Sequence, residues 1–132
     1  MHENKLVWKG ENETFTILQV DSFNKDEDLP EHKEFIVQYE NLNFKGSDRF
    51  VFYKQYYNCL QTDLNELKVN NKQTAHIDDH SKQTDGYINL ELNSNELIIN
   101  GVLGKSTNCN RLNFEFVSSA TLLNGLIDLL LA

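Results

Sequence analysis

Residues 111–132 read "RLNFEFVSSATLLNGLIDLLLA" and carry two hydrophobic periods in succession. The first period is two residues, which predicts a strand with Asn113 and Glu115 facing water and an apolar face formed by Leu112, Phe114 and Phe116. After Ser118 and Ser119, either of which is a suitable helix cap, the spacing becomes helical through Leu122, Leu123, Leu126, Ile127 and Leu130. A strand that leads directly into an apolar helix predicts mixed α and β structure.

The terminal helix is expected to be buried, because Leu129 and Leu131 widen its hydrophobic stripe. Two interpretations are open. The helix fills a groove between a sheet and an earlier helix, or it forms a homodimer contact with a second copy of the chain. Large apolar patches are rare on monomers, which favours the groove. Gly125 lowers helix propensity and indicates close backbone packing at that point.

Three earlier segments alternate in the same way around turn signals, which predicts three β-hairpins. In residues 5–20, "KLVWKGENETFTILQV", the apolar positions are Leu6, Trp8, Phe15, Ile17 and Val20. In residues 34–53, on either side of Gly46, they are Phe35, Val37, Tyr39, Phe50 and Phe52. In residues 87–102, Ile88, Leu90 and Leu92 are the apolar positions of the first strand. An Asn-Ser-Asn turn follows, and the return strand runs from Leu97 to Val102.

Between the second and third hairpins the spacing is helical, since intervals of four and three residues separate Tyr56, Leu60, Leu64 and Leu67. This helix ends near "NNK" (70–72), and a short strand is expected at 75–77. The order of elements predicts one α+β domain over residues 1–132. It is an antiparallel β-sheet built from successive hairpins, with one mid-chain helix and one C-terminal helix packed on it. Both halves run strands and then a helix, which is the pattern of a weak duplication.

The length and charge of the chain exclude several classes of protein. A chain of 132 residues with a net charge of -8 has the size of one domain and lacks the excess of Lys and Arg that nucleic-acid binding requires. Its start, "MHENKLVWKG", has no apolar core of a secretory signal, and no stretch is long enough to span a bilayer, so we expect a cytoplasmic protein without a membrane partner. Two cysteines are too few for a disulfide framework and indicate reduced thiols.

The acidic residues are concentrated near the start of the chain. Residues 21–33, "DSFNKDEDLPEHK", predict an exposed loop around Pro30, and ten of the twenty acidic residues precede Asn41. Such a charge run is usually a solvated surface, but a one-sided negative field can also steer a basic partner. The sequence therefore predicts a partner-binding segment that contains Asp26, Glu27, Asp28 and Glu31.

No stretch indicates a reaction, and we expect a protein without catalytic residues, cofactor or metal. The nearest approach to a metal cluster is His76, Asp78, Asp79 and His80, but they fall at a strand end, where a surface role is commoner. Cys59 is expected in the core, and Cys109 in a loop near Arg111. Residues 100–107, "NGVLGKST", lack the spacing of a phosphate-binding loop and predict a turn or bulge.

One family resemblance adds to this interpretation. The segments that carry it are "FKGSDRFVF", "YYNCLQTDLNELK", "GYINLEL", "LIINGVLG" and the terminal stretch quoted above. From about Phe35 onward the chain resembles the WapI family of immunity proteins, small cytoplasmic proteins that protect bacteria from contact-dependent toxins. It departs from the family at "VSSATL", where relatives often carry an Asp. The resemblance implies a non-enzymatic protein that binds and neutralises a toxin domain, which we expect to be basic.

Two other function classes stay open. The first is a small-molecule binding module, in which aromatic residues such as Trp8, Phe44 or Tyr87 line a pocket between the sheet and the helices. The second is an enzyme with a metal held by His76 and His80. A cavity with convergent polar groups would favour the first class, and metal in the purified protein would favour the second.

Overall fold

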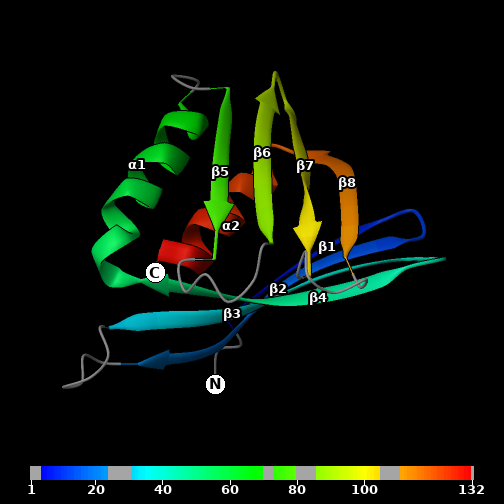
Figure 1. The fold of residues 1–132 in the computed structure, drawn as a ribbon. Helices are drawn as coiled ribbons and strands as arrows, with labels where there is room; N and C mark the ends of the chain where they lie inside the picture. The colour runs from blue at the N-terminus through cyan, green and yellow to red at the C-terminus, as the bar shows by residue number, and fades with distance from the viewer. Residues whose placement is uncertain (1–3, 24–30, 70–72, 80–85, 105–110, 132) are drawn as a thin grey trace.

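The computed structural model describes residues 4–23, 31–69, 73–79, 86–104 and 111–131. The chain forms two antiparallel four-stranded sheets, and each sheet is followed by a helix (Figure 1). The predicted α+β class, the antiparallel pairing and the two helices are confirmed. The sequence predicts one sheet, whereas the strands divide between two.

The first sheet is built from residues 5–53, and strands that follow one another in the chain are neighbours in the sheet. Its strands are β1 (Lys5–Gly10), β2 (Glu13–Phe23), β3 (His32–Asn41) and β4 (Lys45–Tyr53). A 3₁₀ turn, η1 (Lys54–Tyr56), leads into helix α1 (Tyr57–Lys68).

The second sheet repeats this order within residues 74–119, again with sequential strands as neighbours. Its strands are β5 (Thr74–Asp78), β6 (Tyr87–Asn93), β7 (Glu96–Leu103) and β8 (Leu112–Ser119), and helix α2 (Thr121–Leu131) follows. The β6–β7 turn places Ser94 in the left-handed region, with φ 57°, and this matches the predicted Asn-Ser-Asn turn. The two halves therefore share one order of elements, four strands and then a helix.

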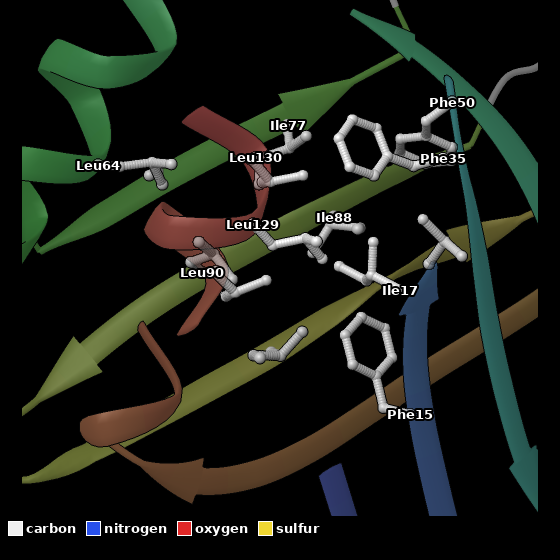
Figure 2. Packing of buried hydrophobic residues seen from close by; sticks show 14 of the residues in the cluster. Phe15, Ile17, Phe35, Phe50, Leu64, Ile77, Ile88, Leu90, Leu129 and Leu130 are labelled. Carbon is white, nitrogen blue, oxygen red and sulfur yellow. The ribbon is translucent and has the colours of Figure 1, made fainter. Parts of the chain in front are cut away.

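The hydrophobic core lies between the two sheets and the two helices. The alternating positions predicted from the sequence face inward, including Phe35, Val37 and Phe50 of the first sheet and Leu90 and Ile99 of the second. Figure 2 shows side chains from β2, β6 and α2 pointing into this interior. Aromatic rings join the sheets, and these contacts include Phe15–Phe114 at 5.7 Å, Tyr39–Phe114 at 5.2 Å and Trp8–Phe116 at 4.2 Å between ring centroids.

Helix α2 is buried within its own chain, because it packs against α1, β1 and β8 (Figure 1). The buried side chains are Leu123, Leu126, Leu129 and Leu130, so this stripe completes the core, while a homodimer through α2 stays a prediction. A Cβ on Gly125 would lie 2.8 Å from Leu6 Cδ1, as the expected close packing requires. Neither helix of the described chain combines the length and the apolar character needed to cross a membrane.

The predicted cap of α2 is wrong in position. The helix begins at Thr121, and the Leu123 N–H donates to the carbonyl of Ala120, so Ala120 precedes the first helical residue. Ser118 lies too early: its hydroxyl donates to the Leu97 carbonyl at 3.0 Å and ties β8 to β7. Ser119 contacts the Thr121 hydroxyl at 2.5 Å. The serine signal in the sequence therefore marks the end of the strand.

The sequence also ends β2 too early. The register shifts between Gln19 and Asp21, which is a β-bulge, and β2 then continues to Phe23 while β3 begins at His32. The expected loop of residues 21–33 is therefore strand at both ends, and His32 is buried. Val20 does not extend the buried stripe, since it is 45% exposed next to the bulge.

Two aspartates link the sheets at the β4 edge. Asp79, only 2% exposed, follows β5 and accepts the Val51 N–H of β4 at 2.9 Å. In the other direction, Asp48 of β4 accepts the Gly104 N–H, just after β7, at 2.8 Å. Gly104 has φ 110° and follows the end of β7 at Leu103, whereas residues 105–107 of the predicted turn or bulge lie outside the described residues. Each aspartate satisfies a backbone donor of the opposite sheet.

We expect the Asp79→Ala variant to lose about 1–3 kcal/mol of unfolding free energy, because the buried Val51 N–H loses its acceptor. Asp78→Ala is the neighbouring control: Asp78 makes a partly exposed contact with His76 Nε2, and its loss should change the unfolding free energy by less than about 1 kcal/mol. Urea unfolding followed by the fluorescence of Trp8 measures both. Equal losses for the two variants would contradict this role of Asp79.

Candidate functional site

Three of the four residues predicted to bind a partner, Asp26, Glu27 and Asp28, lie outside the described residues. Glu31 is described, and its carboxylate lies 3.1 Å from Lys54 Nζ. Its backbone carbonyl also accepts the Lys54 N–H at 2.9 Å. Glu31 therefore ties the start of β3 to η1. Its charge faces a cation, in a pair whose exposed position makes it worth about 0–1 kcal/mol.

A group of carboxylates lies on the outward side of the second sheet, which we name the acidic face. Since side chains alternate along a strand, the buried positions fix which residues point outward. The acidic side chains of this face are Asp78, Glu91, Glu96 and Glu115. Strands β5 to β8 contain no Lys or Arg, so within these strands no lysine or arginine offsets this negative charge.

Hydrogen bonds hold a row of polar side chains across this face. The register places His76 opposite Asn89, and Asn89 opposite Asn100. His76 Nδ1 contacts Asn89 Oδ1, and Asn89 Nδ2 donates to Asn100 Oδ1 at 3.2 Å. The other ring nitrogen, Nε2, lies 2.7 Å from Asp78 Oδ1, and the Tyr87 ring lies 5.3 Å away between centroids. His76 is thus held between two oxygen acceptors and an aromatic ring.

The four residues weighed as metal ligands separate in the structure. His76 and Asp78 meet on the acidic face, but Asp79 points inward to Val51 because it lies one step further along the strand direction. His80 lies outside the described residues. No group of three or more His, Cys, Asp or Glu side chains is arranged to hold a metal ion within the parts of the chain that the structure describes.

A pocket of about 350 Å³ opens between α1 and β5 at the edge of the acidic face, and we name it the α1–β5 pocket. Leu60 and Ile77 supply apolar walls, whereas Asp63 and Asp78 supply carboxylates. A second hollow of about 430 Å³ continues over the sheet and shares Asp63 and His76 with the first. The two hollows are therefore neighbours, and their lining residues extend from α1 to β7 and include Asp63, Asp78 and Glu91.

The sequence interpretation missed the contribution of α1 to this pocket. Cys59 is exposed and lines the pocket, which corrects its expected place in the core. The neighbouring Leu60 takes the inward position, and one helical step turns Cys59 away from it. The detectable signal is the spacing of Tyr56, Cys59 and Asp63, three and four residues apart, which places them on one stripe.

The three aromatic residues considered for a shared pocket do not meet. Trp8 stacks on Phe116 of β8 and packs against the core. Phe44 is 62% exposed in the β3–β4 turn, at the end of the first sheet. Tyr87 lies against His76 on the acidic face. The pocket between helix and sheet is lined instead by Tyr56, which is 45% exposed.

Comparison with known proteins finds no similarity: no family model, curated protein or solved structure matches this chain. The resemblance to the WapI family therefore stays a prediction from the sequence.

Cys109, the other thiol considered, lies outside the described residues.

We expect Cys59 to react with a thiol reagent in the folded protein, because its side chain is exposed at the pocket. Under native conditions, titration with dithionitrobenzoate should show that the Cys59→Ser variant has lost one rapidly reacting thiol relative to the unmodified chain. The slower or faster reaction of Cys109 is common to both proteins and cancels in the difference. Equal thiol release from the two would contradict the exposed position of Cys59.

Proposed function

We propose that this chain is a non-enzymatic immunity-type protein that binds and neutralises a basic toxin domain in the bacterial cytoplasm. The observation that supports the proposal best is the acidic face, whose four strands carry carboxylates without any Lys or Arg. The α1–β5 pocket at its edge supplies a concave place for a partner side chain. The family resemblance supplies the class of partner.

The physical basis is electrostatic steering followed by local anchoring. A surface of one sign attracts a partner of the opposite sign and raises the association rate, more strongly at low salt. Anchoring then depends on a few well-packed contacts, for which tyrosine is a favoured residue. Tyr56, 45% exposed at the pocket rim, and Tyr87 beside His76 are the aromatic side chains in these positions.

Two acidic surfaces compete for this role. The segment with Asp26, Glu27 and Asp28 is the prediction from the sequence, and the acidic face is the surface that the fold assembles from four strands. Glu31 belongs to the segment, but its carboxylate pairs with Lys54. The acidic face is therefore the first surface to vary.

The alternative function is a small-molecule binding module. The α1–β5 pocket favours it, since about 350 Å³ falls within the range of ligand sites and the walls combine Leu60 and Ile77 with the carboxylates of Asp63 and Asp78. In that case the ligand would carry a cationic group, because the described residues of the pocket lining include Asp63 and Asp78 but no Lys or Arg.

The first experiment is co-expression with a candidate basic toxin domain chosen from the neighbouring genes, followed by calorimetry of the purified pair. Rescue of growth and saturable one-to-one binding are expected. In the triple variant Asp78→Asn, Glu91→Gln and Glu115→Gln, the association rate at low salt should fall by about tenfold and lose much of its salt dependence.

The matched control removes the same charge elsewhere, with Glu11→Gln, Glu40→Gln and Asp128→Asn, all exposed and outside the acidic face. It should change the association rate by less than about twofold. A third variant with Asp26→Asn, Glu27→Gln and Asp28→Asn tests the segment predicted from the sequence. If only this third variant slows association, the acidic face is the wrong surface. Failure of rescue with both proteins folded would remove this toxin as the target.

A further inference from the structure

A separate hollow of about 520 Å³ lies where the two sheets meet, and we name it the seam pocket. The first sheet contributes Phe44, Lys45 and Gly46 from the β3–β4 turn and the start of β4. The second sheet contributes Leu103 from the end of β7 and Arg111 and Leu112 at the start of β8. The α1–β5 pocket borders β5, so the two pockets lie at opposite edges of the second sheet.

Local hydrogen bonds fix the apolar rim of the seam pocket. Asn41 Oδ1 accepts the N–H groups of Asn43 and Phe44 at 2.9 and 2.8 Å, and the Asn41 N–H donates to the Phe44 carbonyl. The turn therefore holds Phe44 62% exposed and Leu42 78% exposed. Two large apolar side chains kept in water on an ordered turn are a feature of contact surfaces.

Contacts between the two sheets also fix the position of the residues that line the seam pocket. A Cβ on Gly46 would lie 2.6 Å from Leu112 Cδ2, so the glycine lets β8 approach β4 closely. One residue beyond Leu103, the Gly104 N–H is held by Asp48. The Asp48 carboxylate of β4 therefore accepts a backbone hydrogen bond beside the pocket.

The charge of the seam pocket is opposite to that of the α1–β5 pocket. Among the described residues, its lining includes Lys45 and Arg111 and no carboxylate. Arg111 is the one Lys or Arg among the described residues from 73 to 131. Neither cation forms an ion pair with a described residue. A chain with a net charge of -8 thus presents a pocket in which both charged residues of the described lining are cationic.

We propose that the seam pocket docks an acidic segment of a partner protein. Its carboxylates pair with Lys45 and Arg111, and a neighbouring apolar side chain packs against Phe44 and Leu112. Charge complementarity selects an acidic partner, since arginine and lysine bind carboxylates through charge-assisted hydrogen bonds. Leu42, 78% exposed, lies in the same turn as Phe44 and offers the partner a second apolar side chain outside the pocket lining. This site is separate from the acidic face and goes beyond the proposed function.

The test is an NMR titration of the ¹⁵N-labelled chain at low salt with the blocked peptide acetyl-Asp-Phe-Glu-Leu-amide. Saturable shifts are expected in the amides of residues 42–47, 103–104 and 111–112. The uncharged peptide acetyl-Asn-Phe-Gln-Leu-amide should bind at least about tenfold more weakly, because it lacks the charge-assisted contacts. Equal binding of the two peptides would overturn the proposal, and so would the absence of saturable shifts.

The variant pair tests the location. Lys45→Glu with Arg111→Glu should weaken binding of the acidic peptide at least about tenfold. The control, Lys5→Glu with Lys68→Glu, makes the same change of net charge at exposed residues outside the seam pocket and should weaken it less than about twofold. Equal weakening by the two variant pairs would show that the peptide is attracted by net charge alone, which would contradict the proposed site. Inorganic phosphate at matched ionic strength is a further arm: if it reproduces all the shifts, the pocket takes a bare anion and the proposal is wrong. None of these measurements uses a toxin domain.

Discussion

The rest of the structure depends on one constraint: each four-stranded sheet has an apolar face that only the other half of the chain can cover. The aromatic residues of β8 meet this need directly, since Phe114 contacts Phe15 and Tyr39 of the first sheet and Phe116 stacks on Trp8. Helix α2 fills the remaining space against β1 and α1. Sheets of this kind are stable only when their apolar faces are packed, so the two halves form one core.

The surface chemistry follows from this burial. With inward positions given to the core, the alternate positions of the second sheet are free to carry charge, and they carry Asp78, Glu91 and Glu115. Two cationic residues, Lys45 and Arg111, lie instead where the sheets meet. Each strand of the second sheet thus carries a carboxylate on the acidic face, whereas the two cations of the seam pocket lie at the end where β7 and β8 meet the first sheet.

Local periodicity was sufficient for most elements and for their inner faces. Alternation located Phe35 and Val37, and helical spacing located Leu64, because these signals extend over only a few residues. The same alternation, continued past Ile77, places Asp79 inward and Asp78 outward, although the sequence interpretation grouped them. The division of the strands into two sheets and the existence of the seam pocket could not be predicted from the sequence. They depend on contacts such as that between Gly46 and Leu112, for which no neighbouring residues carry a signal.

The aspartate links at β4 have a further consequence for the behaviour of the chain in a crowded cell. An unprotected edge strand is a template on which strands of other chains can assemble into aggregates. At β4, the Val51 N–H is already occupied by Asp79, and the β7 end is tied alongside through Asp48. At the opposite edge, β1 carries exposed Lys5 and Lys9, whose charges oppose stacking of another strand. Hydrogen bonding at one edge and charge at the other thus guard the first sheet against intermolecular β-sheet growth.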